Sequence, residues 1–331
     1  MRTALDAGVN YLDFVPSEAS AFEGIARALR GQRDKAMLQV HLGASYRGGA
    51  YGWTVNADVA IAEFEERLRM LGTDYADFGF IHCIDEDADF DAVMNGGIWE
   101  YACQRKQDGV IRHLGFSTHS VAIARRFLAT GAMDMGMFSL NPMYDYTNES
   151  AYGAGSADDR ALLYREFERA GVGISVMKAF AGGQLLSAQA SPFARALTPA
   201  QCIQYALDKP GVLTVLPGIR NRDDLADMLA YLDATPEERS YAELAQFAPP
   251  EAAGVCVYCN HCQPCPQGLA IGLINKYYDL ARLGDAMAAD HYRTLDRHAS
   301  DCVHCGHCNR RCPFDVDQSD RMSEIAAYFG R

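Results

Sequence analysis

The chain has 331 residues, of which 49% are hydrophobic and 22% charged, and its formal net charge at pH 7 is −13. This composition suits one large or two ordinary globular domains. The acidic balance argues against nucleic acid as a partner, because proteins grip phosphates through lysine and arginine. No apolar run approaches the roughly 20 residues that cross a bilayer, and the N-terminus lacks a signal-peptide layout. We therefore expect a cytoplasmic protein with no membrane partner.

Residues 1–247 alternate short apolar runs with helix-like stretches. The runs that we predict to be strands are residues 10–14, 36–42, 77–82, 111–117, 133–140, 171–178 and 212–218. Helical patterns lie between them, for example at residues 56–72 and 222–232. Such alternation predicts parallel βαβ units. The number of strands favours a (β/α)8 TIM barrel with its first strand missing, because the competing doubly wound sheet lacks its G-x-G-x-x-G fingerprint.

Polar residues gather where the predicted strands end. They are Asp13, His41, His82, Ser117, His119, Asn141, Lys178, Gly218 and Arg220. In a TIM barrel these ends share one rim, which carries the active site. A single histidine at a strand end is usually structural, but polar residues at successive ends indicate a functional pocket.

Eight of the 11 cysteines lie in two short runs within residues 248–331. The later run has the spacing C-x2-C-x2-C-x3-C-P, in which three thiolates hold one iron–sulfur cube and the fourth ligates a second cluster. The earlier run has one residue fewer before its last cysteine. Clustered cysteines in the cytoplasm indicate metal rather than disulfides. Structural zinc is the alternative, but zinc requires neither the third cysteine nor the proline.

Crossed ligation assigns one cysteine of each run to the cluster of the other. One [4Fe–4S] cluster would then have the ligands Cys256, Cys259, Cys262 and Cys312, and the other Cys302, Cys305, Cys308 and Cys265. The segment between the runs has a helical pattern. We therefore predict a small, mainly α-helical ferredoxin-like domain over residues 248–331. Cys83, Cys103 and Cys202 lie in apolar stretches and are expected to be small buried hydrophobes.

Several stretches occur in the order typical of the aldo-keto reductase family. They are "ALDAGVNYLDF", "LRMLGTDYADFGFIHCID", "KQDGVIRHLGFSTHS", "FSLNPMYD", "GVGISVMKAFAGGQLL" and "VLPGIRNRDDLADML". Together with the cysteine runs, they resemble the branch that carries a C-terminal ferredoxin-type extension. In that family a hairpin and a first barrel strand precede "ALDAGVNY", which accounts for the missing strand. We therefore expect the natural chain to begin upstream of Met1.

The resemblance implies hydride transfer from a nicotinamide cofactor to a carbonyl, with a tyrosine as proton donor beside a lysine, an aspartate and a histidine. By position, the aspartate is Asp13 and the histidine is His82. Glu18 stands in place of the tyrosine, and His41 in place of the lysine. Glu18 could donate a proton only if burial raised its pKa, whereas the pKa of a histidine is naturally near neutral.

The resemblance also implies a binding site for NADP(H). "PGIRNR" resembles the family's phosphate-binding rim, and its arginines could meet a 2′-phosphate, although a cationic helix start is an equal alternative. The tyrosine of "NPMYD" would stack on the nicotinamide, with a lysine charge nearby. The predicted nucleotide-binding set is Ser117, Asn141, Tyr144, Lys178, Gly218, Arg220 and Arg222.

These patterns predict an iron–sulfur oxidoreductase that couples two [4Fe–4S] clusters to redox chemistry in the barrel pocket. Its expected partners are a small-molecule substrate, such as a carbonyl compound, and a ferredoxin-like redox protein. One alternative is a degenerate barrel that serves as a scaffold for an electron-transfer or redox-sensing module. Another is a metal ion held by the two carboxylates and two imidazoles at the rim.

Overall fold

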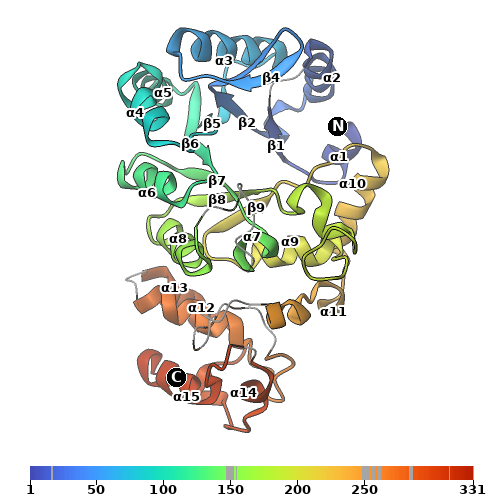
Figure 1. Cartoon of the computed structure of the whole chain (residues 1–331), viewed down its shortest axis with the longest axis vertical. Helices are drawn as coiled ribbons and strands as arrows, with labels where there is room; N and C mark the ends of the chain where they lie inside the picture. Colours follow the sequence, from blue (N-terminus) through green and yellow to red (C-terminus); the bar gives the residue numbers. More distant parts are fainter. Residues whose placement is uncertain are drawn as a thin grey trace. The chain divides into compact units, whose positions relative to one another are not determined.

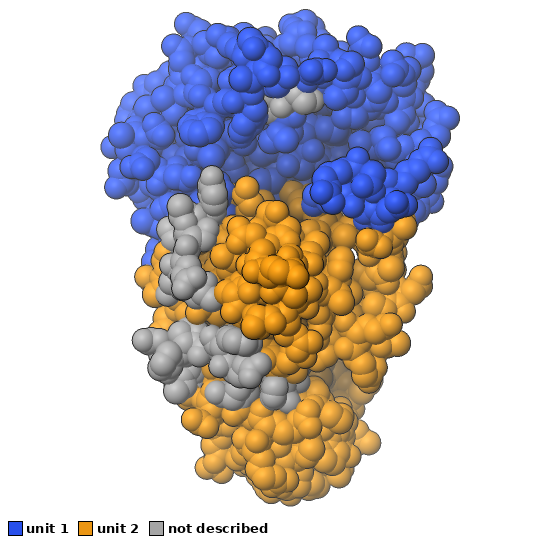
Figure 2. All heavy atoms as spheres, turned by 45° about the vertical axis from the view of Figure 1, so that its right-hand side comes forward, with its two compact units in different colours: residues 1–139, 172–175, 218–225 blue, residues 140–171, 176–217, 226–331 orange. Residues whose placement is uncertain are grey.

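The computed structural model describes the chain except residues 16–17, 147–152, 154, 248–253, 255, 257, 259–261, 283–285, 313 and 331, and the side chains of residues 245–247 and 286. The chain divides into two compact units (Figure 2). Unit 1 comprises residues 1–139, 172–175 and 218–225, and unit 2 comprises residues 140–171, 176–217 and 226–331. The predicted domain boundary between residues 247 and 248 borders residues outside the described ones and stays a prediction.

The main sheet has seven strands in the order β1-β2-β5-β6-β7-β8-β9 (Figure 1). In that order the strands are Tyr11–Phe14, Met37–Leu42, Ala76–Ile81, Ile111–Thr118, Met135–Ser139, Gly173–Met177 and Val212–Val215. A second sheet pairs β3 (Ala44–Arg47) with β4 (Ala50–Trp53). Each of the seven predicted runs holds a strand of the main sheet, and the strands from β1 to β7 pair in parallel. The predicted α/β class is confirmed.

Fifteen α-helices accompany the strands in the described part of the chain. They are α1 Arg2–Asp6, α2 Ala19–Leu29, α3 Ala57–Leu71, α4 Asp87–Asn95, α5 Ile98–Gln107, α6 Val121–Ala129, α7 Pro142–Tyr146, α8 Ala157–Arg169, α9 Pro199–Leu207, α10 Arg222–Leu229, α11 Pro236–Arg239, α12 Ile271–Arg282, α13 Ala286–Arg293, α14 His307–Arg311 and α15 Gln318–Phe329. None of these helices is both long and apolar enough to cross a membrane.

Local sequence explains why α3 forms and which face it buries. The Asn56 side chain accepts a hydrogen bond from the Val59 N–H and caps the first turn, and the helix ends at Gly72 in the left-handed conformation. Ala60, Phe64, Leu68 and Leu71 recur at helical spacing and are buried. This apolar stripe lets α3 pack against β2 in unit 1 (Figure 1).

The register of the strands gathers polar side chains on one face of the sheet in unit 1. Strand β2 is buried on both faces, as expected of a parallel sheet covered by helices. Side chains alternate along a strand, so Gln39 and His41 share the face opposite Leu38 and Val40. Asp13 is the register partner of Gln39, which puts its carboxylate on the same face.

The β3–β4 hairpin lies between β2 and α3 and was not predicted. Gly48 and Gly49 form its turn with φ of 60° and 80°, which matches the positive φ that tight hairpin turns require. The hairpin is closed at its base, where the Thr54 N–H donates to the Gly43 carbonyl at 2.7 Å. Gly43 has φ 92°, and a Cβ there would lie 2.8 Å from the Thr54 carbonyl oxygen. Position 43 therefore requires glycine.

The C-terminal part of unit 2 is mainly helical, as the segment between the cysteine runs predicted. Helices α12, α13 and α15 supply most of its core (Figure 1), which contains Ile274, Tyr278, Tyr292, Met322 and Ile325. The rings of Tyr292 and Phe329 stack with centroids 4.0 Å apart. These contacts bring Cys262 and Cys308 into a small apolar core, and Cys265 and Cys302 pack against it.

Candidate functional site

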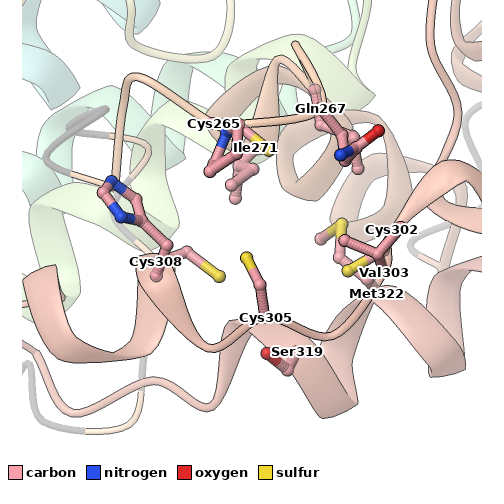
Figure 3. A pocket seen from close by; sticks show the side chains of 12 residues that line it. Cys265, Gln267, Ile271, Cys302, Val303, Cys305, Cys308, Ser319 and Met322 are labelled. Atoms are coloured by element: carbon pink, nitrogen blue, oxygen red, sulfur yellow. The ribbon is translucent and has the colours of Figure 1, made fainter.

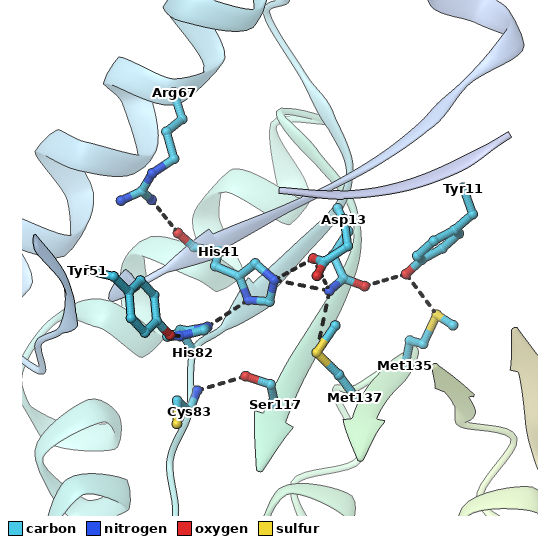
Figure 4. A network of polar contacts seen from close by, with 11 residues as sticks. Tyr11, Asp13, His41, Tyr51, Arg67, His82, Cys83, Ser117, Met135 and Met137 are labelled. Atoms are coloured by element: carbon cyan, nitrogen blue, oxygen red, sulfur yellow. Dashed lines mark hydrogen bonds and ion pairs between the residues drawn. The ribbon is translucent and has the colours of Figure 1, made fainter. Parts of the chain in front are cut away.

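A chain of four hydrogen-bonded side chains lies at the carboxyl ends of β1, β2 and β5 (Figure 4). His41 Nε2 lies 2.7 Å from Asp13 Oδ1. The Nδ1 atom of His41 lies 3.0 Å from the Nδ1 atom of His82. His82 Nε2 lies in turn 2.6 Å from the hydroxyl of Tyr51, which comes from the hairpin. The structure thus brings together three of the four predicted catalytic residues and adds a tyrosine.

Asp13 is also held from the opposite side. Gln39 Nε2 donates to Asp13 Oδ1 at 2.7 Å, and Gln39 Oε1 accepts a hydrogen bond from the Tyr11 hydroxyl. Two sulfur atoms border this pair, since Met135 lies 3.6 Å from the Tyr11 hydroxyl and Met137 lies 4.0 Å from Gln39 Nε2 (Figure 4). Because Gln39 and His41 both donate to it, the carboxylate of Asp13 is fixed as an acceptor.

Arg67 on α3 joins the end of β2 to the hairpin. Its guanidinium donates to the His41 carbonyl at 2.7 Å, to the Ala44 carbonyl, and to Glu63 Oε2 at 2.9 Å. Glu63 in turn accepts the backbone N–H of Tyr46 at 3.2 Å. Burial lowers the pKa of Arg67 to about 10, with Glu63 opposing the shift, so the guanidinium keeps its charge near neutral pH.

Burial and nearby charges set the protonation of His82 and Tyr51, at the outer end of the hydrogen-bonded side chains. Burial, together with the nearby charges of His41 and Arg67, lowers the pKa of His82 well below its ordinary value. Burial, with Cys83 and Asp13 adding to it, raises the pKa of Tyr51 to about 12. At neutral pH His82 is therefore a neutral imidazole, and Tyr51 is an un-ionised phenol.

Glu18 does not join this group. It is the exposed N-cap residue of α2, and its side chain makes no capping hydrogen bond. The proposed metal site of two carboxylates and two imidazoles also lacks support, because the ring nitrogens of His41 and His82 face each other and not one common point. Ser117 lies beside these hydrogen-bonded side chains, and its hydroxyl accepts a hydrogen bond from the Cys83 N–H at 2.7 Å (Figure 4).

A second polar group joins the loops that follow β5 and β6. His119 Nδ1 lies 2.9 Å from Asp85 Oδ2, and Asp85 Oδ1 accepts from the Thr118 hydroxyl at 2.9 Å. Burial raises the pKa of Asp85, but these hydrogen bonds outweigh it and hold that pKa below its ordinary value. Cys83 Sγ lies within 4.8 Å of both the Asp85 and His119 donor atoms. Because the carboxylate is already occupied by hydrogen bonds, we assign this group to fixing the loops.

The residues predicted to bind a nucleotide fall into two groups. In unit 2, Asn141 Nδ2 donates to the Lys178 carbonyl at 2.8 Å, and Asn141 Oδ1 accepts the Tyr144 N–H at 3.0 Å. In unit 1, Gly218 precedes α10, and the exposed Arg220 donates to Asp224 Oδ2 at 3.0 Å. Arg222 is the first residue of α10. Their role in binding NADP(H) stays a prediction.

One pocket in unit 2 is lined by a cysteine of the first run and three of the second (Figure 3). The cysteines are Cys265, Cys302, Cys305 and Cys308. Apolar side chains, including Ile271 and Met322, complete the lining. This grouping is the one that crossed ligation requires, with a thiolate from the first run added to three from the second.

The other four cysteines are only partly described. Cys256 and Cys312 pack in one small cluster with Tyr258, Phe314 and Val316. Cys262 is buried in the core that also contains Cys308. Cys259 lies outside the described residues. The structure therefore brings Cys256 and Cys312, one from each run, into the same cluster of side chains.

The residues around the four-cysteine pocket fit an iron–sulfur cluster. Four thiols are a complete ligand set for one cube. The Ser319 hydroxyl and His307 Nε2 also line the pocket, and both are buried without a nitrogen or oxygen partner in the described part of the chain. Sulfur atoms of a cluster accept hydrogen bonds, so such donors suit the group.

These features define a class of protein. It has a parallel α/β sheet with polar strand ends, and a helical region with a cysteine-lined pocket. The family model described as "Aldo/keto reductase family" matches residues 1–198, and the model described as "4Fe-4S dicluster domain" matches residues 255–317. The chain belongs to the aldo/keto reductase family and carries an iron–sulfur domain at its C-terminal end, as the sequence motifs predicted.

Relatives of known structure share the fold. An aldo-keto reductase from Bacillus halodurans in its holo form is 22% identical with a TM-score of 0.59, and the match covers 74% of this chain and 85% of that one. One from Klebsiella pneumoniae, in complex with NADP and acetate, is 20% identical with a TM-score of 0.51, covering 76% and 84%. L-glyceraldehyde 3-phosphate reductase of Escherichia coli K12 is 24% identical over 128 residues, which span only 36% of either protein.

Proposed function

We propose that this chain is an iron–sulfur oxidoreductase that passes electrons through two [4Fe–4S] clusters to redox chemistry on a small molecule, such as a carbonyl compound. The observation that carries the proposal is the gathering of Cys265 with Cys302, Cys305 and Cys308 around one apolar pocket. That set matches the crossed ligation of a two-cluster domain. The reaction itself would take place at the strand-end site that contains Asp13.

When bound, the clusters supply electrons one at a time. At the four-cysteine pocket the residues of this chain would hold one cluster through thiolates. Ile271 and Met322 would exclude water from it, and Ser319 and His307 would offer hydrogen bonds to sulfur. A hydride transfers two electrons together and needs no cluster. Two clusters are therefore useful if single electrons arrive from a ferredoxin-like protein, which we propose as the partner.

Iron and acid-labile sulfide counts on anaerobically purified protein test the cluster proposal. Two cubes require about eight of each per chain. The double variant Cys302→Ala/Cys305→Ala should retain about half of the iron, because it removes two ligands of one cluster only. Cys103→Ala, a cysteine on α5 outside the two runs, is the control and should retain all of it. Stoichiometric zinc in place of iron would contradict the proposal.

We also propose NADP(H) as a source of electrons, in keeping with the family and with the Klebsiella relative in complex with NADP. Arg220 and Arg222 are suited to a 2′-phosphate, although the phosphate must displace Asp224 from Arg220. NADPH should bleach the cluster absorbance of the oxidised protein at lower concentration than NADH. Arg220→Ala should remove that preference, and the exposed Arg30→Ala should not. Absence of binding by either nucleotide refutes this part.

A scaffold without catalysis is the second candidate, and the exposure of Glu18 at the position of the family's proton donor favours it. In that case the clusters would accept and return electrons while no carbonyl compound is reduced. Product analysis with dithionite-reduced protein and a panel of aldehydes and ketones distinguishes the oxidoreductase from the scaffold. Turnover of one compound by wild type, but not by an Asp13→Asn variant, excludes the scaffold.

A further inference from the structure

We propose that Tyr51 of the β3–β4 hairpin is the proton donor of the strand-end site, and that His41 and His82 relay protons to it from the Asp13 end. The inference rests on the proposed redox function of this site. Its basis is the unbroken line of contacts from Asp13 Oδ1 to His41, His82 and the Tyr51 hydroxyl, at 2.7, 3.0 and 2.6 Å (Figure 4).

The partners of each ring nitrogen fix the direction of these hydrogen bonds. The carboxylate of Asp13 only accepts, so His41 Nε2 carries a hydrogen. The two facing Nδ1 atoms share one hydrogen between them. In the resting state it lies on His82, which leaves His82 Nε2 free to accept from the Tyr51 hydroxyl. Every donor then points toward Asp13, and both imidazoles are neutral.

Adding one proton reverses the outer part of the line. Protonated His41 donates from both nitrogens, to Asp13 and to His82 Nδ1. His82 must then carry its hydrogen on Nε2 and donate it to the Tyr51 oxygen. The hydroxyl hydrogen of Tyr51 is thereby released from His82 and turned outward. In this loaded state the His41 imidazolium lies against the Asp13 carboxylate, at the 2.7 Å contact between Nε2 and Oδ1.

The proton step balances in atoms and charge. The Tyr51 O–H bond breaks as its proton passes to the carbonyl oxygen, while the carbonyl carbon receives a hydride with its electron pair from NADPH. With single electrons from the clusters the line would have to act twice, because two-electron reduction of a carbonyl takes up two protons. The proton on His82 Nε2 moves to the Tyr51 oxygen, and the proton on His41 Nδ1 moves to His82 Nδ1. His41 ends neutral, and one proton has been delivered. Water reloads the line at Asp13, whose side chain is 21% exposed.

The electrostatics of the site favour outward transfer. His82 is a weak base because it is buried and faces the His41, Arg67 and His119 charges, with Asp85 opposing them, so it holds a proton only in passing. The raised pKa of Tyr51 means that a tyrosinate, once formed, takes a proton back readily.

The hairpin presents Tyr51 between the buried line and the solvent. Its hydroxyl meets His82, while the residue as a whole is 48% exposed. Trp53, two residues later on β4 and 58% exposed, has its ring centroid 6.5 Å from that of Tyr51. The exposed ring of the proton donor and the exposed ring of Trp53 beside it favour flat substrates that can stack. We therefore expect aromatic carbonyl compounds to be the preferred class.

Two measurements on the full chain with its clusters test the relay, with Tyr46→Phe as the matched control. Tyr46 is the register partner of Tyr51 on the same hairpin. Nitrogen-15 NMR of labelled histidines should show His82 protonated on Nδ1. In Tyr51→Phe the Nε2 resonance should move to the position of a free lone pair, whereas in Tyr46→Phe it should stay. An unmoved resonance, or a resting proton on Nε2, overturns the relay.

The second measurement is the reduction of benzaldehyde with NADPH or dithionite as the electron source. Tyr51→Phe should lower the rate by about 10²- to 10⁴-fold, the usual contribution of a general acid, and Tyr46→Phe should leave it unchanged. Equal rates in the two variants overturn Tyr51 as the donor. If wild type itself reduces none, the proposed function fails for this substrate class, and the nitrogen spectra decide on the relay alone.

Discussion

Replacement of Arg67 by methionine should destabilise unit 1 by about 3 kcal/mol. The substitution leaves the buried carbonyls of His41 and Ala44 without their donor and Glu63 without its cation. An unsatisfied buried acceptor costs about 1–3 kcal/mol, and a broken buried ion pair costs about 3–5 kcal/mol. We take the lower end, because Glu63 is 17% exposed and keeps its hydrogen bond from Arg47. Methionine retains the apolar stem and the helix propensity.

Tryptophan fluorescence in urea measures this loss selectively, because both tryptophans, Trp53 and Trp99, lie in unit 1. Arg69→Met on the same helix is the matched control. Its side chain is 70% exposed and pairs with an exposed Glu66, and exposed pairs contribute about 0–1 kcal/mol. Equal loss of unfolding free energy in the two variants would refute the view that Arg67 holds the hairpin to the sheet.

Three further perturbations address other parts of the fold. The pKa of His82 is depressed in the folded state, whereas in the unfolded chain it is about 6.5. Below pH 6.5 the unfolded chain therefore binds a proton that the folded chain does not bind. Stability falls by up to about 1.4 kcal/mol per pH unit as the pH drops below that value. His82→Asn should make this fall shallower in urea titrations between about pH 7 and pH 5, and an unchanged slope contradicts the assignment. Gly115→Ala places a Cβ 2.2 Å from a buried aromatic ring and should cost about 1–3 kcal/mol of unfolding free energy, whereas Gly24→Ala, with ordinary contacts, should cost none. In unit 2, Asp145→Asn removes the carboxylate that pairs with the buried Arg160. It should lower stability by about 3–5 kcal/mol in thermal unfolding followed by near-UV circular dichroism, with the exposed Asp158→Asn as its reference.

The strands of the main sheet could be predicted because parallel strands buried on both faces give continuous apolar runs. The run at residues 36–42 became β2 at Met37–Leu42, with its polar residues facing the site. His41 and His82 end successive strands, and a parallel sheet brings such ends together. The proximity of the two rings therefore followed from strand order alone.

The hairpin and its tyrosine were missed for physical reasons. Strands β3 and β4 have four residues each and are partly exposed, so neither shows apolar periodicity. Contact between Tyr51 and His82 joins residues 31 positions apart and has no local signature. The signal that could have located the turn is Gly48-Gly49 between two runs that contain tyrosine.

The two candidate sites differ in how much of their geometry is local. Three cysteines at x2 spacing must lie on one short loop, so Cys302, Cys305 and Cys308 could be grouped from the sequence. Glu18 was matched by counting five residues from Asp13. That count cannot foresee that a residue at the start of α2 faces solvent. Spacing predicts a site well when the chain between its residues is short and tightly turned.

Residues 43–54 form a segment that is closed at its base, because the hydrogen bond between Gly43 and Thr54 joins its two ends. The chain leaves and rejoins the α/β framework at nearly the same point, so its length and side chains can change without altering the register of the sheet. Exchange of residues 43–54 between relatives should therefore transfer the substrate preference that we propose for Tyr51 and Trp53.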